Sequence, residues 1–177
     1  MDTRHLYCIV GPSGSGKTTL MNGLRGYGFT EAISYTTRKC RGKDDEASYH
    51  FTDRDTFLRM VEEGAFAEHV NYIGNLYGVS LEELDHNNFV IVEPAGVEAI
   101  KENYKNRPVV VIGLNASREA LEERLCGRTD NSGSRIDEDQ VKFKDLVVIA
   151  DVCIEGLTPE DTLAKTLEFL RSLGEEF

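Results

Sequence analysis

Short apolar runs recur along the chain at residues 6–10, 89–92, 109–114 and 146–149. Each run is hydrophobic throughout, without the alternation of a strand that has one face in water. Continuous apolar runs of this length are typical of strands in a parallel sheet covered on both faces. We therefore expect these four runs to form the central sheet of the protein.

Segments with helical periodicity separate these runs, and they predict helices over residues 18–24, 53–63, 117–125 and 159–173. In the second of them, Phe57, Met60 and Val61 share one face. Strands that alternate with helices indicate an α/β fold with a mainly parallel sheet flanked by helices. A polar stretch from about residue 33 to 88, with a turn-rich strand pair near 72–78, interrupts the alternation. This stretch is a candidate for an inserted substrate-binding subdomain.

The composition is that of an ordinary globular domain, with 177 residues and a net charge of −11. So acidic a chain does not resemble a general nucleic-acid binder, which needs basic surface to neutralise phosphates. The four cysteines are scattered and signal neither a zinc site nor a disulfide framework. The sequence shows no signal peptide and no run long enough to span a membrane. We expect a cytoplasmic protein that binds neither membranes nor nucleic acids.

A glycine-rich loop follows the first apolar run. Residues 11–18 read GPSGSGKT and fit the phosphate-loop pattern G-x-x-x-x-G-K-[ST], placed between a predicted strand and a predicted helix. Glycines let backbone N–H groups turn toward an anion, and the start of the helix adds a positive end. Lys17 can reach the β- and γ-phosphates of a nucleoside triphosphate, and the Thr18 hydroxyl can bind Mg²⁺. Kinases, GTPases and motor ATPases all use such a loop.

A basic segment follows at residues 34–41, which read SYTTRKCR. Arg38 and Arg41, three residues apart in a polar loop, could grip one phosphate through forked hydrogen bonds, and the phenol of Tyr49 could donate to the same phosphate. On these residues alone, a solvated basic loop explains the pattern as well.

Five motifs in order resemble the guanylate kinase family. They are GPSGSGKTTL at residues 11–20, S-x-TTR-x-x-RG at 34–42, Y-x-F at 49–51, G-x-F-x-E at 64–68 and GN-x-YG at 74–78. The resemblance implies a P-loop kinase fold in one domain. Its core comprises residues 1–32, 89–123 and 141–177, its nucleoside monophosphate (NMP) subdomain residues 33–88, and its short lid residues 124–140.

The resemblance also implies roles for matching residues. Glu68 and Ser34 read guanine, because a carboxylate accepts from guanine N1–H and N2–H₂ together. The GMP-binding set is Ser34, Arg38, Arg41, Tyr49, Glu68, Tyr77, Ser80 and Glu93. The ATP-binding set is Gly11, Ser13, Gly14, Ser15, Gly16, Lys17, Thr18, Thr19 and Arg128. Lys17, Arg124 and Arg135 are the catalytic residues, the two arginines clamping the transferring phosphoryl group, and Thr18 binds the Mg²⁺ cofactor.

The sequence departs from the family pattern in three places. The family has Asp-x-Asp after the NMP subdomain, where this chain has Ile91 and Glu93. After Tyr77-Gly78 it has two hydroxyl residues, where this chain has Val79 and Ser80, so that Ser80 alone could supply the bond to the base. The family's asparagine near adenine corresponds to Ala150 or Asp151, if residues 146–149 form the late strand.

These features predict a guanylate kinase, which converts ATP and GMP or dGMP into ADP and GDP or dGDP as a monomer or homodimer. One alternative is a related P-loop kinase with another acceptor, such as a broad range of nucleoside monophosphates or a ribose bisphosphate. Ile91, Val79 and Glu93 favour it. The intact set of Ser34–Arg41, Tyr49 and Glu68 argues against it. A less favoured alternative is a guanylate-kinase-like binding domain without catalysis.

Overall fold

The first layer of the fold is a parallel sheet. The computed structural model describes residues 3–43, 46–115 and 146–177. Its central sheet has the strand order β6-β1-β7-β8, and every neighbouring pair is parallel. The strands are β1 (Leu6–Val10), β6 (Phe89–Ile91), β7 (Val109–Asn115) and β8 (Val152–Glu155). The strands β6 and β7, which follow later in the chain, lie on opposite sides of β1. In parallel sheets a ligand crevice is expected at the carboxyl end of the strand where the order reverses in this way.

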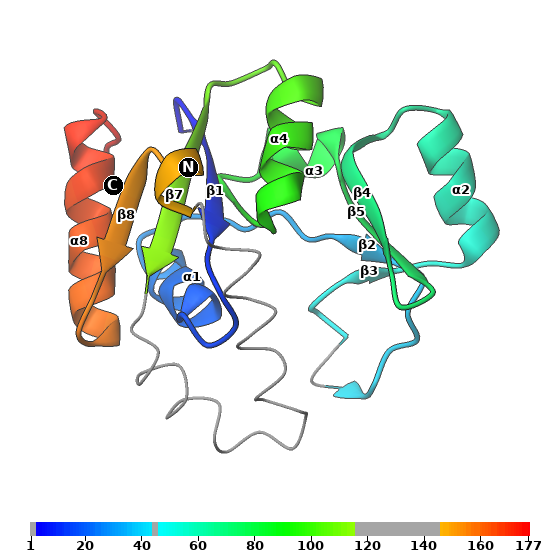
Figure 1. The fold of residues 1–177 in the computed structure, drawn as a ribbon, viewed down its shortest axis with the longest axis horizontal. Helices are drawn as coiled ribbons and strands as arrows, with labels where there is room; N and C mark the ends of the chain where they lie inside the picture. The colour runs from blue at the N-terminus through cyan, green and yellow to red at the C-terminus, as the bar shows by residue number, and fades with distance from the viewer. Residues whose placement is uncertain (1–2, 44–45, 116–145) are drawn as a thin grey trace.

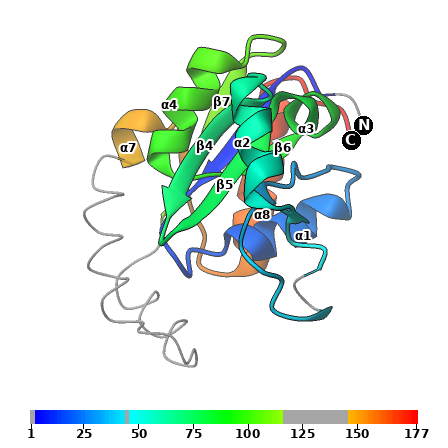
Figure 2. The same cartoon turned by 90° about the vertical axis from the view of Figure 1, so that its right-hand side faces the viewer.

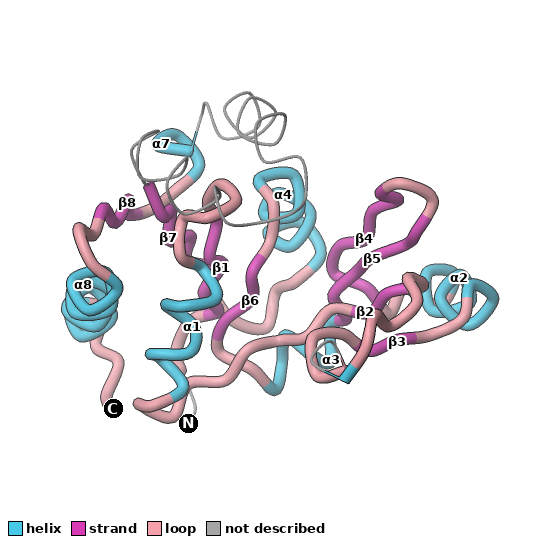
Figure 3. The backbone as a smooth tube through the Cα atoms, turned by 90° about the horizontal axis from the view of Figure 1, so that it is seen from below, coloured by secondary structure: helices cyan, strands magenta, loops and turns pink. Residues whose placement is uncertain are grey.

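Helices cover both faces of this sheet (Figure 1). Seen from below, α1 and α8 lie on one face, whereas α4 and α7 lie on the other (Figure 3). The helices are α1 (Lys17–Arg25), α4 (Pro94–Asn103), α7 (Leu146–Ile149) and α8 (Pro159–Ser172). All five residues of β1 are fully buried. Alternate β1 residues belong to two separate hydrophobic clusters, one packed on α1 and α8 and the other on α4. This explains why the strand is apolar throughout.

A second sheet lies beside the first, with the strand order β3-β2-β5-β4. Its strands are β2 (Tyr35–Thr36), β3 (His50–Phe51), β4 (Phe66–Tyr72) and β5 (Asn75–Ser80), and its helices are α2 (Arg54–Glu62) and α3 (Leu81–His86). Helix α2 lies across it (Figure 2) and buries Phe57 against Phe66 and Leu76. The side chain of Asp53 caps α2 by accepting from the Thr56 N–H at 2.8 Å.

The chain passes between the two sheets at two adjacent points. The N–H of Ala32, where the chain leaves the central sheet, donates to the carbonyl of Phe89 at 2.7 Å. The N–H of Asn88, where the chain returns, donates to the carbonyl of Thr30 at 3.1 Å. The second sheet is therefore attached to the first by two paired segments.

The expected strands at 6–10, 89–92 and 109–114 and the helices at 18–24, 53–63 and 159–173 are confirmed to within a few residues. The expected helix at 117–125 lies outside the described residues. The turn-rich pair near 72–78 is the β4–β5 hairpin, which turns at Ile73 and Gly74, both with positive φ. The part of the chain that the structure describes contains no helix long and apolar enough to cross a membrane.

The expectation of a strand at 146–149 is wrong. These residues form α7, in which Val147 and Val148 are 75% and 82% exposed. A four-residue apolar run has no period that distinguishes a strand from a helical turn. The fourth strand is instead β8, at the edge of the sheet, where Ile154 is buried. The residues that follow the late strand therefore begin at position 156, not at Ala150 or Asp151.

Helix α4 was not expected from the sequence. It begins at Pro94, a position where proline is tolerated because its missing N–H would have no helical partner. Val97 and Ile100, three residues apart, are its buried positions. These two signals could have predicted the helix. It matters for function because α4 packs on β4 and on the central sheet together.

Candidate active site

The glycine-rich loop connects the carboxyl end of β1 to α1. Gly11 is buried so tightly that an added Cβ would lie 2.6 Å from the Leu114 carbonyl oxygen and 2.7 Å from the Ser15 hydroxyl. Gly16 has φ 97° and precedes the first residue of α1. Any other residue would be strained there, because a Cβ disfavours this left-handed region. The loop conformation thus depends on the glycines at both ends.

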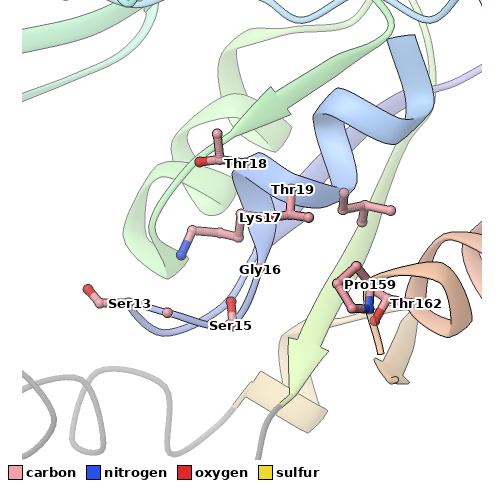
Figure 4. Close-up of a pocket in the computed structure, with 10 residues that line it drawn as sticks. Ser13, Ser15, Gly16, Lys17, Thr18, Thr19, Pro159 and Thr162 are labelled. Atoms are coloured by element: carbon pink, nitrogen blue, oxygen red, sulfur yellow. The ribbon is translucent and has the colours of Figure 1, made fainter. Parts of the chain in front are cut away.

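A cavity of about 480 Å³ lies over this loop (Figure 4). Its walls comprise residues 13–20 together with Pro159 and Thr162 at the start of α8. The Nζ atom of Lys17 donates to the carbonyls of Gly11 at 2.6 Å and Pro12 at 2.9 Å. The cavity therefore combines a cation, hydroxyl groups and the amino end of α1, as an anion site requires.

Nearly all of the predicted ATP-binding residues lie around this cavity. Those that line it are Ser13, Gly14, Ser15, Gly16, Lys17, Thr18 and Thr19. Gly11 does not line it and acts instead through its carbonyl, which holds Lys17. Within the described part of the chain, the buried Ser15 hydroxyl oxygen makes no hydrogen bond. The three predicted lid arginines, Arg124, Arg128 and Arg135, lie outside the described residues.

A second cavity, also of about 480 Å³, lies where the second sheet faces α4. Predicted GMP-binding residues from five separate parts of the chain line it: Ser34, Arg38, Arg41, Tyr49, Glu68, Tyr77 and Glu93. The structure does not bring Ser80 to this cavity. Its hydroxyl instead accepts from the Glu83 N–H at 3.1 Å and caps α3. The hydroxyl predicted to contact the base is thus engaged in holding a helix.

Two aromatic rings lie against Arg38, one of the residues that line the second cavity. Its guanidinium carbon lies 5.2 Å from the centre of the Tyr49 ring and 5.4 Å from that of Phe51. The rings of Tyr49 and Tyr77 are 5.8 Å apart and meet edge to face. Such cation–π contacts orient the guanidinium without occupying its hydrogen-bond donors. The Nη1 atom of Arg38 donates to the Lys39 carbonyl at 2.9 Å, a bond that a phosphate beside the two phenols could replace.

Glu68 lines the same cavity from β4. The pairing of β4 with β5 shifts between Phe66 and Glu68, so that an extra residue re-aims the strand at this point. The Glu68 carboxyl group lies against the first turn of α4, where a Cβ added to Gly96 would be 3.6 Å from its Oε2 atom. Burial, aided by the charge of Glu93, raises the pKa of Glu68 to about 7, although a hydrogen bond with the Val79 backbone opposes the rise.

The remaining wall near Glu68 is largely apolar. Ile91, Val92 and Ala95 line it, and Val79 is completely buried. Position 91 is one at which the family pattern has an acid, and position 79 one at which it has a hydroxyl. Beside this apolar wall, Glu68 and Glu93 bring two carboxyl groups to the cavity.

Sequence reasoning missed several residues that line the second cavity. Val70 and Tyr72 lie two and four residues beyond Glu68 on β4, and Ala95, Gly96 and Ala99 lie on α4. The period of two along a strand would have placed Val70 and Tyr72 beside Glu68, had β4 been predicted to its full length. The α4 residues could not be found, because that helix was not expected.

Comparison with known proteins agrees with this arrangement. The model of the guanylate kinase family matches residues 3–173 of the chain. A guanylate kinase from Alcanivorax borkumensis is 42% identical over 136 residues, which are 72% of this chain and 65% of that protein. One from Chromohalobacter salexigens is 39% identical over 139 residues, which are 73% of this chain and 64% of that protein. The chain thus spans just under two thirds of the length of these relatives.

A solved structure shows the same fold. The crystal structure of guanylate kinase from Anaplasma phagocytophilum superposes with a TM-score of 0.70 at 23% sequence identity, covering 99% of this chain and 89% of that one. At that identity the likeness bears on the fold alone. The family model covers almost the whole sequence, from β1 to the end of α8. The chain therefore belongs to the guanylate kinase family.

Proposed function

We propose that this protein transfers the γ-phosphoryl group of ATP to GMP or dGMP. The observation that carries the proposal is the pair of cavities, one over a phosphate loop and one that gathers Arg38, Tyr49, Tyr77 and Glu68. A phosphate loop alone would suit many nucleotide-binding proteins. The second cavity adds a place for an acceptor that has a phosphate at one end and a hydrogen-bonding base at the other.

In this proposal, the acceptor phosphate lies between Arg38, Arg41, Tyr49 and Tyr77. Guanine lies at the opposite end, where ionised Glu68 accepts from N1–H and N2–H₂. Adenine has neither an N1 proton nor a 2-amino group, so neither bond can form. The partly buried carboxylate would then lack both partners, and this loss of binding free energy favours guanine. Glu93 contacts the acceptor nucleoside from the start of α4. Ser80 holds α3 and does not contact the base.

The proposed division of the chain follows the sheets. The second sheet, within residues 33–88, is the NMP-binding subdomain, and residues 1–32, 89–123 and 141–177 form the core. Residues 124–140 form the lid, from which Arg124 and Arg135 reach the transferring phosphoryl group and Arg128 approaches adenine. Closure of both parts over the core would exclude water, which otherwise hydrolyses ATP.

Catalysis by these residues consists of positioning and charge neutralisation, since the acceptor phosphate is itself an anionic nucleophile. Lys17 exchanges its bonds to the carbonyls of Gly11 and Pro12 for the β- and γ-phosphates. Backbone N–H groups of the loop orient the same phosphates. In the described residues, no three histidine, cysteine or acidic side chains cluster as a metal site. Mg²⁺ would be held by the Thr18 hydroxyl together with phosphates and water, where it would neutralise charge on the phosphates.

The test is ADP release with ATP·Mg²⁺ and GMP, dGMP, AMP, CMP, UMP or dTMP in turn, using Lys17→Met as the matched inactive control. We expect turnover with GMP and dGMP alone. Turnover spread across several bases would establish a kinase with a broader acceptor range, the second candidate, which the apolar residues Ile91 and Val79 favour. Absence of turnover with all six acceptors would contradict the proposal.

A further inference from the structure

Glu83, on α3, lies outside both cavities yet joins three separate segments of the second sheet. Its Oε2 atom accepts from the backbone N–H of Ile33 at 2.8 Å and from the side-chain amide of Asn87 at 3.2 Å. Its Oε1 atom lies 2.9 Å from Nε2 of His50. A single, mostly buried carboxylate thus holds the segment before β2, the strand β3 and the end of α3.

Two of these contacts are one residue away from the second cavity. Ile33 precedes Ser34, and His50 follows Tyr49, and both Ser34 and Tyr49 line that cavity. The two segments are also tied directly, because the His50 N–H donates to the Ser34 carbonyl at 2.9 Å. A shift of Ile33 or His50 would therefore move Ser34 and Tyr49 together. In the proposed function, Ser34 contacts guanine and Tyr49 contacts the acceptor phosphate.

Glu83 also lies next to the junction between the two sheets. The chain leaves the central sheet through Ala32, immediately before Ile33, and returns through Asn88, immediately after Asn87. Both segments that connect the two sheets therefore contact Glu83, one through Ile33 and the other through Asn87. The cap from Ser80 fixes the backbone of Glu83 in turn, because its hydroxyl accepts from the Glu83 N–H. This explains why a hydroxyl residue is useful at position 80 although it does not line the cavity.

We propose that Glu83 is a positioning residue for the acceptor site. Glu83 holds Ser34 and Tyr49 at the separation that a nucleoside monophosphate requires. The inference rests on the proposed function. Removing the carboxylate leaves the Ile33 N–H and the His50 ring without this partner, and charge-assisted hydrogen bonds of this kind are among the stronger ones in proteins. ATP binding does not depend on it, because the phosphate-loop cavity has no wall from α3.

The experiment compares Glu83→Ala, Glu83→Gln and the matched control Glu82→Ala, which alters an exposed residue of the same helix. For Glu83→Ala we expect the KM for GMP to rise roughly tenfold, with the KM for ATP within about twofold of the parent. Glu83→Gln should restore most of the GMP affinity, since its amide oxygen can still accept from Ile33. An unchanged KM for GMP, or equal increases for GMP and ATP, would overturn the inference.

Two further measurements keep the result decisive. If Glu83→Ala does not fold, His50→Ala removes one contact and leaves α3 intact, and a smaller rise in the KM for GMP is expected. Amide hydrogen exchange of residues 33–34 and 49–50 needs no activity. It should accelerate in Glu83→Ala, less in Glu83→Gln, and not in Glu82→Ala. A parent enzyme inactive with GMP would contradict the proposed function alone, whereas unchanged exchange at these amides would contradict the role of Glu83.

Discussion

Glu93, at the start of α4, faces Glu68, on β4, so that its negative charge adds to burial in raising the pKa of Glu68 to about 7. Glu68 belongs to the second sheet, whereas Glu93 directly precedes α4, which covers the central sheet. The relationship makes the charge of the proposed guanine-reading residue sensitive to pH in the physiological range. Because the same carboxyl group is buried, its ionisation affects both the proposed binding of guanine and the free energy of unfolding.

The affinity for guanine nucleotides is expected to rise as pH increases through about 7, because only ionised Glu68 can accept two hydrogen bonds from guanine. Glu93→Gln removes the neighbouring charge, lowers the pKa of Glu68 and should shift this rise to lower pH. Calorimetric titration with GMP from pH 5.5 to 8.5 measures both profiles. The phosphate of GMP titrates equally in both experiments, so coincident profiles of parent and variant would refute the coupling.

The same pKa predicts that Glu68→Gln stabilises the free protein at alkaline pH. The pKa of Glu68 is raised from 4.5 to about 7, so the folded state binds the proton more tightly than the unfolded state. Stability contributed by the protonated carboxyl group is complete below pH 4.5 and is lost as pH rises to about 7. The loss is at most about 3 kcal/mol. Urea unfolding of Glu68→Gln should show its advantage at pH 8 and little of it at pH 5.

An exposed glutamate provides the control for this measurement. Glu62→Gln, near the end of α2, should leave the free energy of unfolding almost unchanged at both pH values. If Glu68→Gln were no more stable than the parent at pH 8, the ionised carboxylate would not be destabilising in the folded state. Guanine affinity should fall in Glu68→Gln at every pH, which separates the two roles of the residue.

Lys17→Met should lower kcat by at least about a hundredfold while the fold persists. The Lys17 ammonium group donates to the loop carbonyls of Gly11 and Pro12. The loop itself is shaped by its glycines, so methionine should be tolerated. Circular dichroism and thermal melting check the fold, and steady-state kinetics check kcat. Turnover near that of the parent in folded protein would exclude the proposed role.

Arg38→Lys should weaken GMP binding about tenfold or more, although the charge is retained. Lysine has no planar fork for a phosphate, and it loses the stacked arrangement of the guanidinium over Tyr49 and Phe51. The KM for ATP should stay close to that of the parent. Lys39→Ala is the control, since Lys39 is exposed and does not line the cavity. Equal effects of the two substitutions on the KM for GMP would indicate a general electrostatic effect.

Much of this protein could be predicted from the sequence because the relevant signals are local. The run at 6–10 is apolar throughout since its residues face two hydrophobic clusters, and the spacing from Gly11 to Thr18 encodes a loop that needs few distant contacts. Around the second cavity, Arg38, Arg41 and Tyr49 were candidates from their residue types, whereas Ser34, Glu68 and Tyr77 could be named only through the resemblance carried by five motifs. Their spacing by itself did not reveal that they meet.

The tertiary structure decided what depends on packing between distant segments. The run at 146–149 is a helical turn with Val147 and Val148 exposed, because β8 completes the sheet in its place. Ser80 caps α3 rather than lining the second cavity, because the start of that helix directs its hydroxyl to the Glu83 N–H. The pKa of Glu68 depends on burial beneath α4, a property that no local pattern encodes. Periodicity and motif spacing report the neighbours along the chain, whereas burial and charge depend on neighbours in space.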